Sequence, residues 1–231
     1  MKKKILTGLT SGALMLGMVG VANATLVTSI PDGKIISIPA VNYSGIEPQT
    51  FDSGNITWSS TNASNQGDPL FGWDWGYGFG SNGNWLTPIV MAGLNEATST
   101  YAVTDTMTFS FSSPVKAVGG FINYYPDGGD QPVISVYDAS NTLIESATLN
   151  FSTGGDNNTG QFYGFSESNP SIKYFTLTDA YIGITDLTTT ANAPEPASMI
   201  LIGTGIAGIS AMRRKKKQQS EPSQETVSLP C

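Results

Sequence analysis

Residues 25–192 of the sequence predict a single antiparallel β-sandwich, which places the protein in the all-β class. The segment is rich in Gly, Ser, Thr, Asn and aromatic residues, apolar and polar residues alternate in short runs, and turn-forming sequences separate these runs. Helical periodicity is nearly absent from it. Its length suffices for one domain with its own hydrophobic core, so we expect one domain.

The run 106–111 shows the alternation most clearly. Met107, Phe109 and Phe111 occupy every second position, so their side chains share one face of a strand. Further strands are expected wherever similar runs lie between turn sequences such as 126–129. These strands are 115–123, 133–138, 142–149, 161–165, 172–178 and 181–187.

The N-terminus has the three regions of a secretory signal peptide at residues 1–24. Lysines at positions 2–4 precede a mostly apolar run, 5–21, and the small residues Ala22 and Ala24. The lysines hold the start of the chain in the cytoplasm, and signal peptidase accepts small side chains at the two alanine positions. We expect cleavage after Ala24; the alternative is a retained N-terminal anchor.

The C-terminal part predicts a membrane segment. Pro194, Glu195 and Pro196 precede sixteen uncharged residues, 197–212, and the basic cluster 213–217 follows them. As a transmembrane helix these residues would span roughly 24 Å, less than the roughly 30 Å hydrocarbon core of a bilayer. Because basic residues stay in the cytoplasm, both ends of the chain predict export of the part between them.

The Pro-Glu-Pro motif, the apolar stretch and the pair Arg213-Arg214 occur in the order of a PEP-CTERM sorting signal of Gram-negative bacteria, which they resemble over residues 193–217. The resemblance implies processing by exosortase, a transpeptidase-like integral-membrane enzyme of species that make exopolysaccharide. The protein would be anchored transiently in the inner membrane and then reach the cell surface or extracellular matrix. The alternative is an ordinary C-terminal membrane helix behind a Pro-rich linker.

Small residues within 197–212 favour processing over permanent anchoring. They leave a slim helix surface that another helix can approach closely, and glycine lowers helix propensity. The segment therefore suits binding and local unwinding by a membrane enzyme. Residues 218–231 continue past the basic cluster, where this family usually stops, and are expected to form a cytoplasmic tail that contains Cys231, the single cysteine.

The predicted sandwich carries a second resemblance, over residues 104–188. Its strand sequences, in their order along the chain, look like the jelly-roll ectodomains often found in PEP-CTERM proteins, which are similar to galactose-binding-like modules. The resemblance implies a jelly-roll-like sandwich. It rests on the sequences at 118–121, 134–138, 162–165 and 182–187.

The predicted sandwich is strongly acidic. Of the eighteen acidic residues in the chain, only Glu195, Glu221 and Glu225 lie outside residues 25–192, whereas eight of the eleven basic residues do. The net charge of this segment is therefore about −12, although that of the whole chain is −7. Such a surface repels nucleic acid and favours cations or neutral partners, which excludes a nucleic-acid-binding function.

The sequence contains no histidine, and residues 25–192 contain no cysteine. Disulfides, thiol nucleophiles, Ser-His-Asp triads and His-ligated zinc sites are therefore excluded from that segment. Carboxylate-only catalysis, as in glycoside hydrolases, remains as an alternative, with Glu96, Glu145 and Glu167 as its candidates. No residues form a recognisable catalytic set, so we expect that the protein is not an enzyme.

The segment 68–85 is unusually rich in aromatic residues and glycine. Aromatic rings stack on the C–H faces of sugars while Asp and Asn bind hydroxyl groups, so this segment is a candidate carbohydrate platform. Trp73 and Trp75 share parity and are expected to point the same way. The alternative is that the aromatic residues cover one end of the sandwich. The candidate glycan contacts are Trp73, Asp74, Trp75, Tyr77 and Trp85.

Carboxylates in predicted turns are candidate ligands of a structural calcium ion, which takes six to eight oxygen ligands. They match neither an EF-hand nor a nonapeptide calcium motif, and the alternative is that they are simply solvated. The resemblance to jelly-roll carbohydrate-binding modules implies a late acidic ligand near Asp186. The candidates are Asp127, Asp130, Asp156, Asp179 and Asp186.

The sequence thus predicts an exported protein of the cell surface or biofilm matrix with a structural or carbohydrate-binding role. Its expected partners are signal peptidase, exosortase, the inner membrane before processing, and exopolysaccharide. Two alternatives remain: a carboxylate-dependent polysaccharide-active enzyme and a passive surface coat protein.

Overall fold

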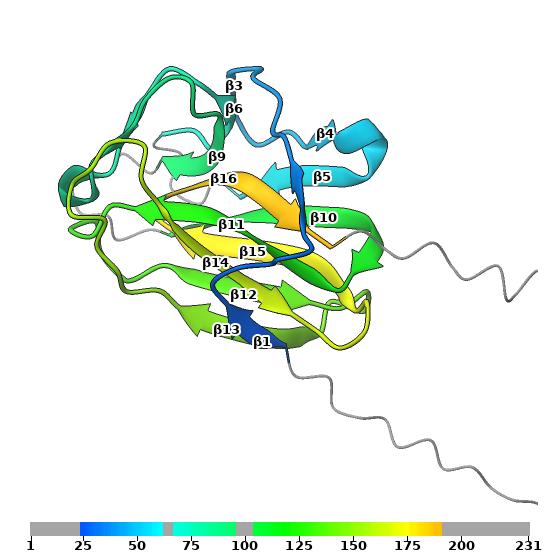
Figure 1. Ribbon diagram of the computed structural model, residues 1–231. Helices are drawn as coiled ribbons and strands as arrows, with labels where there is room; N and C mark the ends of the chain where they lie inside the picture. The colour runs from blue at the N-terminus through cyan, green and yellow to red at the C-terminus, as the bar shows by residue number, and fades with distance from the viewer. Residues whose placement is uncertain (1–23, 62–66, 96–103, 191–231) are drawn as a thin grey trace, which may run out of the picture.

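The computed structural model describes residues 24–61, 67–95 and 104–190. Within these ranges the protein is all-β, and its helical elements are two single 3₁₀ turns, η1 (Asp52–Gly54) and η2 (Gly80–Asn82). Most strands belong to two antiparallel sheets (Figure 1). The predicted fold class is therefore confirmed.

Eight consecutive strands form the centre of the sandwich. One sheet contains the neighbours β9, β16, β11 and β14, and the other contains β10, β15, β12 and β13. The first of these strands, β9, therefore pairs with the last, β16. The pairs β10 with β15, β11 with β14 and β12 with β13 are nested inside this outer pair. This is the connectivity of a jelly roll. The strands are β9 (Met91–Asn95), β10 (Asp105–Val115), β11 (Ala117–Tyr124), β12 (Val133–Tyr137), β13 (Leu143–Thr148), β14 (Gln161–Ser166), β15 (Ile172–Asp179) and β16 (Tyr181–Thr189).

The strands predicted from the sequence coincide with β10 to β16. The largest difference is at the end of β10, which was expected to stop at 111 and continues to Val115. Its register with β15 shifts between Ser110 and Val115, which is a β-bulge or a similar irregularity. The alternation is therefore lost where the strand bends, and the sequence pattern hides the extension.

The N-terminal half adds shorter strands to the edges of both sheets. β1, β6 and β3 extend the first sheet, and β5 and β4 extend the second. β2 joins the same edge of β16 as β9, but farther along, because β9 pairs with residues 181–184 and β2 with 187–189. These strands are β1 (Thr25–Val27), β2 (Lys34–Ile36), β3 (Tyr43–Ser44), β4 (Gln49–Phe51), β5 (Ile56–Ser60) and β6 (Leu70–Trp73).

The main core lies between the two sheets. Met107, Phe109 and Phe111 are buried on the inner face of β10, as their alternation predicts. Phe109 stacks on Phe175 of β15 with ring centroids 6.5 Å apart, and Trp58 of β5 packs on Phe71 of β6 at 5.3 Å. Full burial of each such side chain contributes about 1.5–3 kcal/mol, so the aromatic contacts hold the sheets together.

A second, smaller core supports the aromatic segment. Tyr77 of β7 (Tyr77–Gly78) stacks on Tyr181 of β16, with centroids 4.7 Å apart and planes 14° from parallel. Phe79 packs edge-on against Trp85 of β8 (Asn84–Trp85) at 5.0 Å. The two-stranded sheet of β7 and β8 is thereby fixed against β16.

The signal peptide, apart from Ala24, and the segment 193–231 lie outside the described residues. Ala24 is buried, and β1 begins at the next residue. No helix within the described ranges is long and apolar enough to cross a bilayer. The expected transmembrane helix, 197–212, lies outside the described ranges.

Candidate functional site

Trp73, Trp75 and Leu86 form an aromatic tip at the end of β6. Trp73 is half-buried, whereas the side chain of Trp75 is 73% exposed. The two indole rings lie 5.1 Å apart at 57° to each other. Gly76 approaches Leu86 closely enough that a Cβ there would lie 3.6 Å from the leucine side chain. The tip therefore presents a large apolar surface to solvent.

The backbone under this tip is held by specific contacts. The Asp74 N–H donates to Asn42 Oδ1 at 3.0 Å, and the Thr87 hydroxyl donates to the Asp74 carbonyl oxygen at 2.7 Å. Gly72 has a φ of +64°, and a Cβ at this position would overlap the carbonyl oxygen of Pro39. These contacts fix the direction in which Trp73 and Trp75 leave the strand.

Tyr77 and Trp85 lie beneath the tip and not on its surface. Trp85 is 2% exposed, and its indole N–H donates to the carbonyl oxygen of Thr159 at 2.9 Å. The Tyr77 hydroxyl donates to the carbonyl oxygen of Leu94 at 2.9 Å. Among the five candidate glycan contacts, exposed ring surface is therefore found at Trp73 and Trp75.

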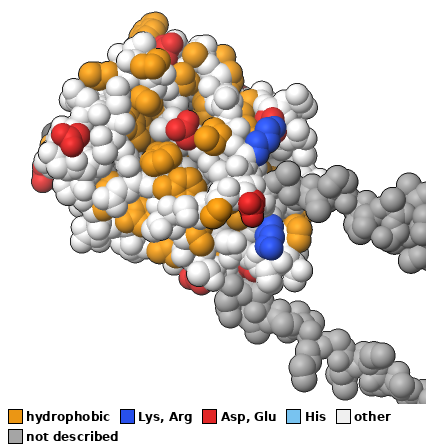
Figure 2. All heavy atoms as spheres, in the orientation of Figure 1, with side chains coloured by type: hydrophobic (Ala, Val, Ile, Leu, Met, Phe, Trp, Pro, Cys, Tyr) orange, Lys and Arg blue, Asp and Glu red, His pale blue; other side chains and the backbone are white. Residues whose placement is uncertain are grey.

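A shallow groove of about 300 Å³ adjoins the tip on the outer face of the first sheet. Trp85, Ile89 and Phe121 supply its apolar walls, and Thr185 and Asp186 of β16 also line it. Figure 2 shows hydrophobic side chains gathered across the middle of one face of the molecule, with few charged side chains between them. Leu86 links the groove to the tip, because its N–H donates to Asn158 Oδ1 at the groove's rim, 2.6 Å away.

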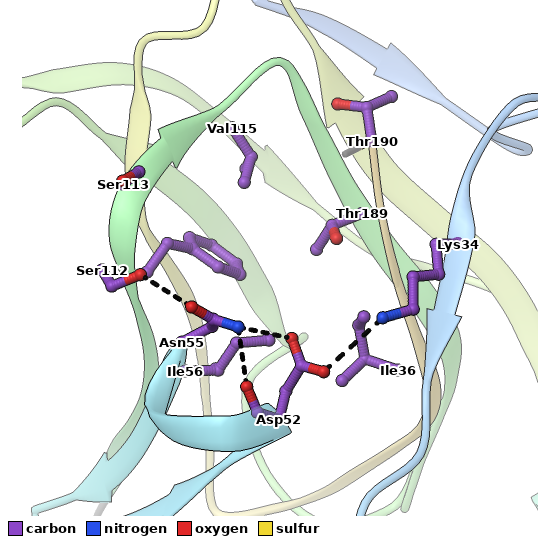
Figure 3. A pocket seen from close by; sticks show the side chains of 11 residues that line it. Lys34, Ile36, Asp52, Asn55, Ile56, Ser112, Ser113, Val115, Thr189 and Thr190 are labelled. Carbon is purple, nitrogen blue, oxygen red and sulfur yellow. Dashed lines mark hydrogen bonds and ion pairs between the residues drawn. The ribbon is translucent and has the colours of Figure 1, made fainter. Parts of the chain in front are cut away.

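A more polar pocket of about 260 Å³ lies at the end of the sandwich where β16 finishes (Figure 3). Lys34 pairs with Asp52 at 3.6 Å, and the side-chain N–H of Asn55 donates to the Asp52 carbonyl oxygen at 2.8 Å. The Ser112 hydroxyl donates to Asn55 Oδ1 at 3.3 Å. The polar groups at the centre of this pocket therefore already satisfy one another.

The five acidic residues predicted as calcium ligands are spread over the molecule. Asp127 and Asp130 follow β11, Asp156 lies between β13 and β14, and all three are exposed, as is Asp186 on β16. Asp179, at the end of β15, is buried. Among the described residues, no three acidic, histidine or cysteine side chains gather in the arrangement of a metal site.

Sequence reasoning missed the buried acidic residue Asp105, which lies directly opposite Asp179. Burial raises the pKa of Asp179 to about 7, against the lowering effect of hydrogen bonds from the Ala180 and Tyr181 backbone, and the charge of Asp130 raises it further. The available signal was Asp105's position two residues before Met107, which places a carboxylate on the inner face of β10.

Glu145 and Glu167, two of the candidates for carboxylate catalysis, lie near each other. Burial raises the pKa of Glu167, and the charge of Glu145 on β13 raises it further. Glu167 follows β14, and its backbone N–H donates to the carbonyl oxygen of Lys116 at 2.8 Å. Glu96 lies outside the described residues.

The comparisons with known proteins bear on the C-terminal part of the chain. A family model described as the PEP-CTERM protein-sorting motif matches residues 192–216. The chain carries a PEP-CTERM sorting motif. The match is shifted by one residue toward the N-terminus relative to the predicted segment, 193–217. It includes Pro194, Glu195, Pro196, Arg213 and Arg214. No curated protein matches the chain.

The PEP-CTERM motif implies export, a membrane-anchored C-terminus before processing, and processing by exosortase. The motif follows directly on the sandwich, because β16 ends at Thr189 and the match begins at residue 192. The jelly roll therefore lies directly on the N-terminal side of the sorting motif.

Proposed function

We propose that this protein is a component of the cell surface or extracellular matrix that binds a neutral exopolysaccharide through its aromatic tip. The observation that carries the proposal is the exposure of Trp75, 73%, beside Trp73 on a fixed backbone. Large exposed aromatic surfaces on soluble domains mark binding sites, and a sugar ring offers the C–H face that an indole ring stacks on.

The charge of the sandwich favours a neutral ligand. Its net charge of about −12 would repel an acidic polysaccharide, most strongly at low ionic strength, where the charges are least screened. The groove beside the tip supports the same ligand class, since the exposed ring of Phe121 and the exposed side chain of Asn158 both line it. A polysaccharide chain could contact the tip and the groove together.

The proposed role involves no catalysis. Signal peptidase would release the N-terminus after Ala24, exosortase would remove the tail, and the jelly roll would remain on the surface or in the biofilm matrix of a Gram-negative cell. A polysaccharide-active enzyme built on Glu145 and Glu167 would instead release reducing sugar, and replacement of either residue by Gln would abolish this release.

The test is binding of the full chain, purified in detergent, to an array of neutral polysaccharides and to the exopolysaccharide of the producing cells. Trp75→Ala should weaken binding at least tenfold and leave the unfolding temperature unchanged. Leu143→Ala on edge strand β13 is the matched control, because Leu143 is also exposed and apolar. A passive coat protein would bind none of these polysaccharides, or would bind them equally well without Trp75.

A further inference from the structure

Glu167 carries a buried carboxylate at the end of β14. The residue is only 3% exposed, and its Oε1 atom is buried and has no hydrogen-bond partner among the described residues. Glu167 has the parity of Phe165, a core residue of β14, so its side chain turns toward the interior. A buried carboxylate oxygen without a partner is costly, and native proteins contain few of them. A positive group that contacts this oxygen would remove the cost.

The neighbouring side chains do not provide such a group. The Glu167 N–H donates to the Lys116 carbonyl oxygen at 2.8 Å, but the Lys116 side chain is exposed. Within the described ranges no basic side chain forms an ion pair with Glu167. Burial raises the pKa of Glu167, and the negative charge of Glu145 raises it further. The surroundings of this carboxylate therefore lack a compensating charge.

The edge strand β1 brings the expected signal-peptide cleavage site to this carboxylate. β1 pairs with β14 at the edge of the first sheet (Figure 1), and Thr25 lies directly opposite Ser166. One residue further along both chains, the same register sets Ala24 opposite Glu167. Cα atoms paired in this way lie about 4.5–5.5 Å apart. The peptide bond between Ala24 and Thr25 is therefore within reach of the Glu167 side chain.

Cleavage after Ala24 would create the missing positive group. Hydrolysis of the Ala24–Thr25 peptide bond leaves a carboxylate on the removed signal peptide and an amino group on Thr25. This amino group takes up a proton at neutral pH, because the pKa of an α-amino group is about 8. Ala24 is 5% exposed, so its removal also leaves space in the interior that an ammonium group can occupy.

We propose that Glu167 binds the N-terminal ammonium group of mature Thr25, so that removal of the signal peptide completes this edge of the sandwich. The inference rests on the cleavage after Ala24 that the proposed function includes. A charge-assisted hydrogen bond between ammonium and carboxylate is about twice as strong as one between neutral groups. It would fasten β1, which has only three residues, to β14. The processed chain is then more stable than the unprocessed chain.

The test compares a processed and an unprocessed form of the full chain, both produced in an exporting host without exosortase and purified in detergent. Ala22→Leu blocks cleavage, because signal peptidase accepts small side chains at this position, and it leaves Ala24 in place. Edman degradation of the processed form should read Thr25 first. Any other N-terminus overturns the proposal at this step and leaves glycan binding by the aromatic tip unaffected.

Glu167→Gln should have opposite effects in the two forms. In the processed form it removes the partner of a buried ammonium group and should lower the unfolding temperature by roughly 3–10 °C. In the unprocessed form it replaces an unpartnered carboxylate with a neutral amide, so the unfolding temperature should stay constant or rise. Glu145→Gln, at a half-buried neighbouring carboxylate, is the matched control and should act equally in both forms. Equal effects of Glu167→Gln in the two forms would overturn the proposal.

The reactivity of the Thr25 amino group provides a second measurement, which uses the processed wild type itself. Periodate cleaves an N-terminal threonine between the carbons that carry its amino and hydroxyl groups, and mass spectrometry follows the reaction. The folded wild type should react roughly tenfold more slowly than the protein in urea, because a buried amino group reacts only when β1 opens. Folded Glu167→Gln should react faster than the folded wild type. Equally fast reaction of the wild type with and without urea would show that the ammonium group lies in solvent, which contradicts the proposal.

Discussion

The indole N–H of Trp85 donates to the carbonyl oxygen of Thr159 at 2.9 Å, which fastens β8 to the loop before β14. The same oxygen accepts the side-chain N–H of Asn123 on β11 at 3.1 Å. One carbonyl group therefore joins three segments that are far apart in the sequence. This junction holds the aromatic segment on the sheet. Trp85, which takes part in it, stabilises the fold, whereas Trp75 is exposed and available for binding.

Trp85→Ala should lower the free energy of unfolding by about 3–5 kcal/mol, because it leaves a large cavity beside Phe79 and removes a hydrogen bond. Trp75→Ala, by contrast, should change it by less than about 0.5 kcal/mol, since Trp75 is exposed. Urea unfolding followed by tyrosine and tryptophan fluorescence would measure both. Equal losses for the two variants would contradict the division between supporting and exposed tryptophans.

Asn82 links η2 to two other segments and should not tolerate a change of its amide group. Its side-chain N–H donates to the Tyr124 carbonyl oxygen at 3.1 Å, and its Oδ1 accepts the Thr153 N–H at 3.1 Å. Asn82→Asp replaces the donor with an acceptor and buries a charge, so we expect a loss of roughly 2–4 kcal/mol. Asn169→Asp, at an exposed position, is the control and should be nearly neutral in chemical denaturation.

Gly72→Ala should destabilise the protein and weaken glycan binding together. The position has a φ of +64°, and the added Cβ would overlap the carbonyl oxygen of Pro39, so the backbone of β6 or of Pro39 must shift. We expect a cost of about 1–3 kcal/mol. Gly154→Ala is the matched control: its φ is also positive, but nothing lies within 4 Å of the added atom. A smaller loss for Gly72 than for Gly154 would contradict the steric argument.

The long strands of the jelly roll could be predicted from the sequence, whereas the short ones could not. β10 alternates over Met107, Phe109 and Phe111, and a run of this length identifies a strand by its periodicity. β3, β7 and β8 contain two residues each, which is too few for any alternation to appear. Tertiary contacts define these strands, such as the stacking of Tyr77 on Tyr181 across a large sequence separation.

The candidate sites show the same limit. The shared parity of Trp73 and Trp75 was visible in the sequence, but the burial of Trp85 depends on contacts with Thr159 and Phe79 that no local pattern encodes. Asp179 was selected as a carboxylate in a predicted turn, yet Asp105, which lies opposite it, is far away along the chain and becomes its neighbour only through the β10–β15 register. Sequence order identified single residues, and the sheet topology determined which of them meet.

The free energy of unfolding should respond to pH through Asp179. Its pKa in the folded protein, about 7, lies above the ordinary value of 3.8, so protonation favours the folded state. The stabilisation is complete below pH 3.8 and is lost as the pH rises to 7 and beyond. Asp105 across the strand pair and Asp130 in the loop after β11 are the acidic groups that face it.

The free energy of unfolding of Asp179→Asn should therefore increase relative to that of the wild type as the pH rises. The difference in unfolding free energy between the two proteins should change by roughly 2–4 kcal/mol between pH 4 and pH 8. Denaturant titrations at several pH values would measure it, with Asp156→Asn as the exposed control. A difference that stays constant over this range would show that Asp179 titrates normally.

The PEP-CTERM motif at 192–216 predicts that the C-terminal tail is removed from the mature protein. Mass spectrometry of the mature surface form should find its N-terminus near Thr25 and its C-terminus near Pro194, with Cys231 absent. Replacing residues 194–196 by alanines should leave the tail attached and the protein in the inner membrane, because the apolar segment and the basic cluster would still anchor it.

A matched replacement in the tail, Glu221→Ala, should leave processing unchanged, since this residue lies beyond the matched motif. The stretch 197–212 would span only roughly 24 Å as a helix and contains several glycines, so it is better suited to recognition by a membrane enzyme than to lasting anchorage. Recovery of Cys231 on the mature surface form would show instead that this stretch is a permanent anchor. The jelly roll would then act at the membrane and not in the matrix.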